Sequence, residues 1–365
     1  MYLLGLAVVA VGIAGVLWSL SSALRTLVLP RPPKHGVLEL LFTLVRGGFR
    51  FAASHLKTYE AQDSLLSLEE PAALVGVLLV WITAALFGFT AILAPVEGIS
   101  IGRAFAEAGS SMFTLGFVGP HGIAATAIDF SAAGTGLVIV ALQIGYLPTL
   151  YAAFNRRETL VTMLESRAGA PAWGPELLAR HQLVGIIDDL PAFYARWEEW
   201  AADVAETHTT YPSLLYLRSP HPRYSWLVSL VAVLDSAALY LALCPSSAPS
   251  QARLCLRMGF SALRAIAEAV GIPFDPDPSP SDPIELPRAE FEAAFARLAG
   301  IGFPIETDPA HAWPQFQGWR VNYESVAQDL AARIMAPPAP WTGPRPGLRP
   351  IPLQPTRPTD RRPGD

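Results

Sequence analysis

The chain has 365 residues, of which 52% are hydrophobic and only 16% are charged, and its mean hydropathy is +0.34. Such a composition excludes an ordinary soluble protein and predicts a membrane protein with a soluble part. The net charge of -5 shows no basic excess, which excludes nucleic acid as the main partner.

The first predicted element is a transmembrane helix over residues 3–24, a run without any charged side chain. At 1.5 Å per residue, the run is long enough to cross a hydrocarbon core of about 30 Å. The alternative is a cleaved signal peptide. Against it, no Lys or Arg precedes the run, and the run is longer than a usual signal-peptide core.

Two further apolar runs, 72–96 and 123–154, predict two more spans, for three in all. The segment between them, 97–122, holds Arg103 as its only Lys or Arg. By the positive-inside rule we expect a multi-pass protein of the cell membrane, with the N-terminus and 97–122 outside and the segments 25–70 and beyond 155 cytoplasmic. The basic residues that flank the spans on the expected cytoplasmic side are Arg25, Arg31, Lys34, Arg46, Arg50, Lys57, Arg156 and Arg157.

Within the first cytoplasmic segment, residues 36–55 read GVLELLFTLVRGGFRFAASH. This stretch is amphipathic and interrupted by charges, which favours an interfacial helix along the inner leaflet over a fourth span.

The external segment between the second and third spans is predicted to begin with a short helix over 99–113, followed directly by Thr114-Leu115-Gly116-Phe117. A short helix that enters the membrane and stops leaves its last carbonyls unpaired. Non-helical backbone persists at that depth only where protein or a water-filled cavity surrounds it. We therefore expect a re-entrant loop that lines a pathway. The alternative is a plain extracellular loop whose glycines form turns.

The order of outer span, short helix, Thr-Leu-Gly-Phe and inner span, over about residues 72–158, resembles the pore of potassium channels, whose filter reads T-x-G-[YF]-G. In that family, filter carbonyl oxygens from four chains replace the water shell of the ion. The resemblance implies a homotetramer in the lipid bilayer that conducts monovalent cations, K⁺ first among them. The implied selectivity filter comprises Thr114, Leu115, Gly116, Phe117, Val118 and Gly119.

The sequence departs from the family at Val118, which stands where the family has its second glycine. A β-branched residue resists positive φ, so the outermost carbonyl need not point at the axis. The preference for K⁺ over Na⁺ is therefore left open.

Residues around this segment are predicted to support it. Glu107 lies midway along the short helix, where a buried carboxylate would need a hydrogen-bond partner such as Ser110 or Ser111. We expect Glu107 to brace the structure, and the alternative is that it contacts the ion. Asp129 is expected at the outer mouth, where it either raises the local cation concentration or acts as an ordinary interfacial carboxylate.

The third span contains small or helix-breaking residues, among them Gly136, Gly145 and Pro148. If the family resemblance holds, Gly136 or the 145–148 region is the gating hinge. The equal alternative is close helix packing through small residues.

Beyond about residue 165 the composition is that of a globular protein with helical periodicity, which predicts an all-helical cytoplasmic domain. Residues 226–243 are nearly long enough to span, but Asp235 at their centre favours a buried domain helix. Cys244 and Cys255 are expected to be reduced core residues. The tail after Ala336 is dense in proline and arginine and is predicted to be disordered.

The predicted fold class is all-α, with three transmembrane helices, a re-entrant pore helix and loop, and a helical cytoplasmic domain. The predicted function is passive conduction by a pore-loop cation channel, without enzymatic activity, cofactor or metal beyond the permeant cation. The alternatives are a membrane-anchored helical signalling or scaffold protein and, third, a membrane-bound enzyme that uses the cytoplasmic histidines and acids. The predicted parts are 1–30, 31–70, 71–158, 159–336 and 337–365.

Overall fold

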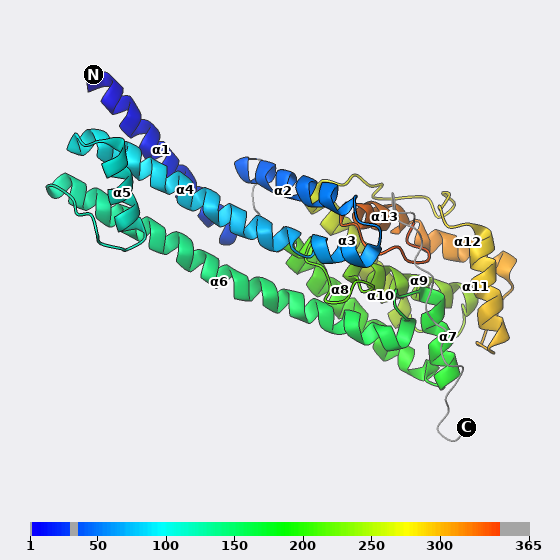
Figure 1. Ribbon diagram of the computed structural model, residues 1–365. Coiled ribbons are helices and arrows are strands. Elements are labelled where there is room, and N and C mark those ends of the chain that lie inside the picture. The colour runs from blue at the N-terminus through cyan, green and yellow to red at the C-terminus, as the bar shows by residue number, and fades with distance from the viewer. Residues whose placement is uncertain (1, 30–35, 344–365) are drawn as a thin grey trace. The chain divides into compact units, whose positions relative to one another are not determined.

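The computed structural model describes residues 2–29 and 36–343, and its regular elements in these ranges are all helices (Figure 1). The chain divides into two compact units. Unit 1 comprises Met1–Phe51 and Leu68–Ala152, and unit 2 comprises Ala52–Ser67 and Ala153–Asp365. The predictions for residues 31–35 and for the tail beyond 343 lie outside the described residues.

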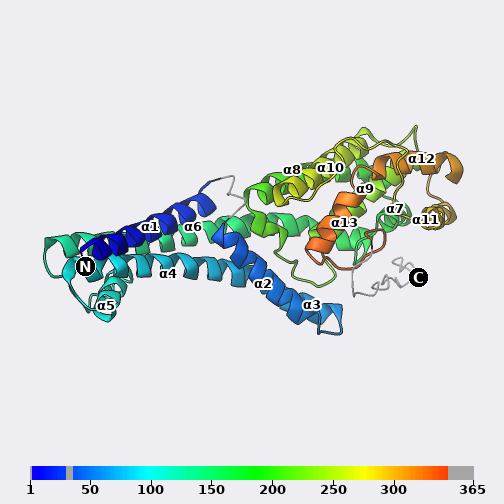
Figure 2. The same cartoon turned by 90° about the horizontal axis from the view of Figure 1, so that it is seen from above.

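Unit 1 contains α1 (Tyr2–Leu27), α2 (Val37–Ala53, up to Phe51), α4 (Glu69–Glu97), α5 (Ile101–Met112) and the first part of α6 (Ile123–Ala168). Helices α1 and α4 lie side by side (Figures 1 and 2). Their backbones touch where two glycines meet, since a Cβ on Gly12 would lie 2.6 Å from the carbonyl oxygen of Gly88. Small residues allow this close approach between apolar helices.

Polar side chains fasten the same pair of helices. The Ser19 hydroxyl donates to the carbonyl of Trp81 at 2.8 Å, and the Trp81 indole N–H donates to the Ser22 hydroxyl at 3.0 Å. Trp81 is fully buried. The position of α1 along α4 is therefore specified by both packing and hydrogen bonds.

Helix α2 is amphipathic, as its sequence predicts. Leu38, Leu41 and Phe42 pack against the core of unit 1. The Arg46 guanidinium pairs with Glu70 at 3.1 Å and approaches Glu69 at 3.6 Å, which joins α2 to the first turn of α4. The other face leaves apolar side chains exposed, namely Val37, Leu40, Leu44 and Phe51.

Four helices in the described part of the chain are long and apolar enough to cross a membrane. They differ in what covers them. The apolar window of α9 (Trp226–Leu243) is 94% buried inside the protein, whereas those of α1, of the segment that includes α4, and of α6 are 17%, 33% and 22% buried. Three helices therefore present apolar surface outward, and α9 is a core helix of unit 2.

Unit 2 is built around α9. It further contains α3 (Tyr59–Leu66), the rest of α6, α7 (Gly174–Val184), α8 (Leu190–Thr210), α10 (Ser250–Val270), α11 (Arg288–Gly300), α12 (Pro309–Arg320) and α13 (Glu324–Arg333), with short 3-10 helices η1 (Ile187–Asp189) and η2 (Pro212–Leu215). Helices α7, α8, α10, α12 and α13 all contact α9, and α8 lies beside α10 (Figure 2). Cys244 and Cys255 are buried and free, as predicted.

The charge at the centre of α9 is neutralised within unit 2. Asp235 accepts hydrogen bonds from the Arg320 guanidinium at 2.5 Å and from the Tyr323 hydroxyl at 2.7 Å. Arg320 also donates to Glu324 at 2.8 Å. Because all four side chains are buried, this network explains how an apolar helix accommodates an aspartate inside the core of unit 2.

Two details of unit 2 differ from the sequence prediction. Helix α12 was not predicted; it begins with Pro309 after Asp308, whose carboxylate accepts from the backbone N–H groups of Ala310 and His311. The predicted disordered tail begins too early, because Trp341 is buried against the rings of Trp173 and Phe316, and its carbonyl accepts a hydrogen bond from Arg320. The folded part therefore extends beyond Ala336.

Candidate functional site

The candidate site is the hairpin of residues 97–122, which joins α4 to α6 at one end of unit 1 (Figure 1). Helix α4 ends at Gly98, whose φ of +66° is left-handed. Ser100 then caps α5 by accepting from the N–H of Arg103. One face of α5 is buried, formed by Ala104, Glu107, Ala108, Ser110 and Met112. Helix α5 is therefore a packed element of unit 1.

The end of α5 is a Schellman motif. The N–H of Leu115 donates to the carbonyl of Ser110 at 2.7 Å, and the N–H of Thr114 donates to that of Ser111 at 3.0 Å. Thr114 occupies the left-handed position with φ +57°, where glycine is the usual residue. A side chain with a Cβ costs about 1–2 kcal/mol in this conformation. The predicted filter thus begins at a strained residue, and Gly116 follows with φ +72°.

The segment after the turn runs back along α5 and is held at two places by hydrogen bonds. The Ser110 hydroxyl accepts from the N–H of Val118 at 3.1 Å and lies 3.3 Å from its carbonyl oxygen, to which it donates. The N–H of His121 donates to Glu97 at 2.9 Å, and the His121 ring contacts Arg103. Sequence reasoning missed these bonds, since a serine–valine backbone pairing leaves no sequence pattern.

The C-terminal end of α5, which we call its tip, contacts α4 and α6 well away from the ends of these helices that flank the hairpin. A Cβ on Gly136 of α6 would overlap the carbonyl oxygen of Met112, and one on Gly109 would touch Leu86 of α4 at 3.7 Å. Gly136 lies thirteen residues after Ile123, and Leu86 lies eleven residues before Glu97. At 1.5 Å per residue, the C-terminal end of α5 therefore lies about 16–20 Å from the end of α4 and from the start of α6.

Three carboxylates gather beside α5. The side chains of Glu97, Glu107 and Asp129 are 3%, 0% and 6% exposed. Glu107 interacts with both of the others, and Asp129 also lies beside the Ser111 hydroxyl. Neither oxygen of Glu107 has a hydrogen-bond partner within the described residues. Burial of a carboxylate without a hydrogen-bond partner is unfavourable. The packing of the helices therefore does not by itself account for this cluster.

One expectation about these acids is not met. Ser110 and Ser111 do not hydrogen-bond Glu107, because the Ser110 side chain is turned to Val118 and that of Ser111 toward Asp129. Asp129 is buried in the second turn of α6 in the single chain, and its place at the outer mouth of an assembled pore stays a prediction. Among residues 2–29 and 36–343, no group of three His, Cys, Asp or Glu side chains could hold a metal ion.

The remaining predicted filter residues are exposed on the single chain. Leu115 and Phe117 are 63% and 66% exposed, and Gly116 and Gly119 are also open to solvent. Ile123 and Phe130, at the start of α6, expose apolar side chains near them in the sequence. Exposed apolar side chains of this size suit contact with lipid or with another copy of the chain.

The three candidate hinge residues of α6 have different surroundings. Gly136 is buried against Met112 and is required for this close approach. Gly145 and Pro148 are exposed, with open space around Gly145. The helix continues through all three to Ala168. The structure thus favours the packing interpretation for Gly136, whereas the 145–148 region has room to bend.

No protein-family model matches the chain, and no curated protein or solved structure matches it either.

Proposed function

We propose that the protein is a pore-loop channel, in which four copies of the 97–122 hairpin surround a path for monovalent cations across a bilayer. The observation that supports this most strongly is the position of the α5 tip, about 16–20 Å along α4 and α6, where the backbone leaves the helix and returns. In a membrane, non-helical backbone at such a depth requires protein or water around it.

The proposed topology has three spans. Helices α1, α4 and α6 have the length and the outward apolar surface of spanning helices, and the burial of α9 in unit 2 removes it from the set. By the positive-inside rule, the basic residues around 25–57 and at Arg156 and Arg157 favour a cytoplasmic location for these flanks. The hairpin then opens to the outside, and unit 2 is the cytoplasmic domain.

The chemistry of the hairpin suits a cation. The carboxyl end of α5 carries partial negative charge and is directed toward the proposed path. The carbonyls of residues 114–119 supply oxygen ligands, and Thr114 and Gly116 have the left-handed backbone that redirects successive carbonyls. The buried acids Glu97, Glu107 and Asp129 add negative potential next to the loop.

Four copies are needed because one hairpin cannot encircle an ion. The exposed Leu115 and Phe117 side chains give the hairpin apolar surface that neighbouring copies would cover. We propose K⁺ as the first cation to test, with Val118 as the residue at which selectivity departs from that of potassium channels.

The experiment is a flux assay in liposomes that contain the full chain. The test variant is Gly116→Asp, which places a carboxylate side chain beside the proposed path. The matched control is Gly185→Asp. Both glycines have nearly the same φ, +72° and +74°, and at both a Cβ would meet open space, but Gly185 ends α7 in unit 2.

We expect K⁺ flux in the wild type and in Gly185→Asp, and its loss in Gly116→Asp. Equal flux from the wild type and Gly116→Asp would remove the filter assignment. A wild type without flux of any monovalent cation would leave the membrane-anchored signalling or scaffold alternative.

A further inference from the structure

Helix α2 presents an apolar face outward from unit 1. Val37, Leu40, Leu44 and Phe51 are between 55% and 72% exposed. Their spacing of three, four and seven residues places them on one side of a helix. A Cβ on Gly47, which lies on the same side, would meet open space. We call the surface formed by the four apolar side chains the outer face of α2.

The opposite side of α2 is fixed to unit 1. The Leu41 side chain lies 3.4 Å from the position that a Cβ on Gly76 of α4 would take, and Leu38 and Phe42 pack against the same core. Arg46 pairs with the first turn of α4. These contacts determine which side of α2 meets the core, so the outer face keeps its outward direction.

The outer face lies between two spans of the proposed topology. Helix α1 ends at Leu27, α2 begins at Val37, and α4 begins at Glu69. With α1 and α4 in the bilayer, their cytoplasmic ends hold α2 at the bilayer surface. An amphipathic helix in this position buries its apolar face about 5–10 Å into the boundary between headgroups and acyl chains. This step rests on the proposed membrane topology and not on conduction.

The chain around α2 is strongly basic. Residues 25–57 contain six Lys or Arg and a single acid, Glu39, although the whole chain has a net charge of -5. Arg25 is exposed in the last turn of α1, and Arg50 is half-buried in the last turn of α2. At about 100° per residue, Arg50 lies about 110° from the centre of the outer face. When that face is among the acyl chains, the guanidinium is therefore at the level of the lipid phosphates.

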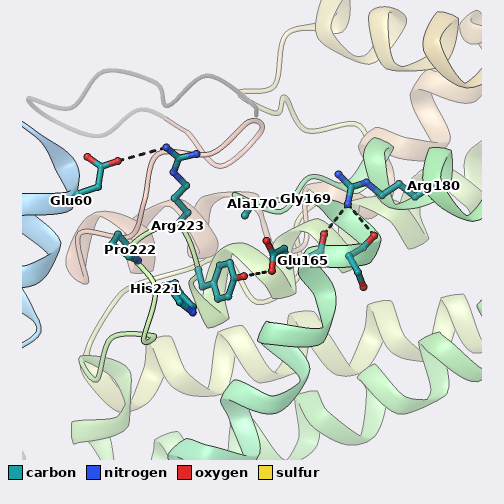
Figure 3. Close-up of a pocket in the computed structure, with 10 residues that line it drawn as sticks. Glu60, Glu165, Gly169, Ala170, Arg180, His221, Pro222 and Arg223 are labelled. Carbon is teal, nitrogen blue, oxygen red and sulfur yellow. Dashed lines mark hydrogen bonds and ion pairs between the residues drawn. The ribbon is translucent and has the colours of Figure 1, made fainter. Parts of the chain in front are cut away.

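Basic side chains in unit 2 are compensated inside the protein. A cavity of about 720 Å³ beside the C-terminal end of α6 has Arg180 and Arg223 in its walls (Figure 3). Arg180 donates to the carbonyls of Glu165 and Ser166. Arg223 lies 3.9 Å from the Glu60 carboxylate. Around α2, by contrast, the six basic residues outnumber the acid of their own segment and the two acids at the start of α4.

We propose that the outer face of α2 docks on a lipid surface rich in anionic phospholipid, with Arg25 and Arg50 at the phosphates. Basic clusters next to a span attract anionic headgroups, and each basic residue strengthens the attraction about fivefold. The apolar side chains alone would suit a second copy of α2 equally well. Two copies of this basic segment repel each other, whereas an anionic lipid surface attracts both its charges and its apolar face.

The test uses the full chain in bilayers of equal parts phosphatidylglycerol and phosphatidylcholine. Leu44→Cys carries a fluorophore on the outer face. The native Cys244 and Cys255 are buried, and burial raises the pKa of both thiols, so they stay unlabelled. Each of the two phospholipids is supplied in turn with a nitroxide quencher on its acyl chain. The ratio of the two quenching efficiencies reports which lipid lies against the outer face.

The charge variant is Arg25→Gln/Arg50→Gln in the labelled background. Its control is Arg253→Gln/Arg257→Gln, which removes the same charge from two exposed positions of α10. Salt at about 1 M, where the Debye length is about 3 Å, screens the same charges without any substitution. The salt measurement therefore does not depend on the folding of a variant.

We expect phosphatidylglycerol to quench more strongly than phosphatidylcholine. The ratio should fall at least about fivefold in the charge variant, fall in high salt, and stay unchanged in the α10 control. Equal quenching by the two lipids, or a ratio that high salt leaves unchanged, overturns the preference for anionic lipid. An equal fall in both double variants overturns the role of Arg25 and Arg50.

The remaining outcome concerns the docking itself. No quenching by either lipid would show that protein covers the outer face, and would overturn the proposal. K⁺ flux enters none of these measurements. A chain that prefers phosphatidylglycerol but conducts no cation therefore retains this inference and overturns the proposed channel alone.

Discussion

Both units bury carboxylates inside apolar helical packing, but the surroundings of these carboxylates differ. In unit 2, Asp235 is neutralised by Arg320 and hydrogen-bonded by Tyr323. In unit 1, Glu107 is equally buried, but neither of its oxygens accepts a hydrogen bond within the described residues. Two further carboxylates, Glu97 and Asp129, interact with it unfavourably, and among the described residues Arg103 is the one cation that offsets them.

The difference is between a charge that the fold stabilises and one that the fold leaves unfavourable. A buried ion pair with complete hydrogen bonds lets an aspartate sit inside a core. A buried acid without hydrogen-bond partners destabilises the fold, and such unfavourable features concentrate at sites that act on ligands. The hairpin of unit 1 also contains the left-handed Thr114, so two unfavourable features occur together there.

The largest expected effect comes from breaking the satisfied network. Arg320→Met should lower the free energy of unfolding by about 3–5 kcal/mol, because Asp235 is left buried without its cation. Chemical denaturation measures this. Arg288→Met is the control, since its pair with Glu292 is half-exposed and should change stability by at most about 1 kcal/mol. Similar losses in both variants would contradict the account of Asp235.

The second effect concerns the packing of the hairpin tip. Gly136→Leu should destabilise unit 1 by about 1–3 kcal/mol and abolish flux, because the new side chain collides with the carbonyl of Met112. Gly134→Leu, two residues earlier on α6, meets open space and should conserve both properties. Thermal denaturation and liposome flux provide the measurements, and equal behaviour of the two variants would refute the predicted contact.

The third prediction has the opposite sign. Glu107→Gln should raise the stability of the full chain by about 1–3 kcal/mol, because it removes a buried carboxylate whose oxygens accept no hydrogen bond and keeps the side-chain shape. Glu290→Gln, on the exposed surface of α11, serves as the control and should have no effect. A lower melting temperature for Glu107→Gln would show that the carboxylate is stabilised in the folded protein.

The smallest expected change in stability is at the turn. Thr114→Gly relieves the strain of a left-handed β-branched residue, about 1–2 kcal/mol, and part of this gain is offset by the greater freedom of glycine in the unfolded chain. If the threonine is kept for conduction, flux should fall although stability does not. Unchanged flux would make Thr114 dispensable to the pathway.

The sequence predicted the elements that composition and periodicity control. The uncharged runs that became α1 and α4 stand out by length, and Asp235 together with the shortness of the run marked 226–243 as a domain helix. Helix α12 escaped prediction because Pro309 and Pro314 obscure its period, although Asp308 caps it.

The geometry of the candidate site was less accessible. Contacts such as Ser110 with Val118, Glu97 with His121 and Gly136 with Met112 join residues whose pairing depends on where α5 turns. Glu107 is buried, but it does not have the suggested serine partners, because the Ser110 hydroxyl is used by the returning backbone. The filter assignment and the channel function stay predictions.

The most direct test of the central claim is an electron cryo-microscopy map of the full chain in lipid nanodiscs with K⁺. We predict four copies around one axis, with the carbonyls of residues 114–118 facing that axis and cation density between them. A monomer or dimer, or an assembly in which these carbonyls face away from any shared axis, would contradict the proposal.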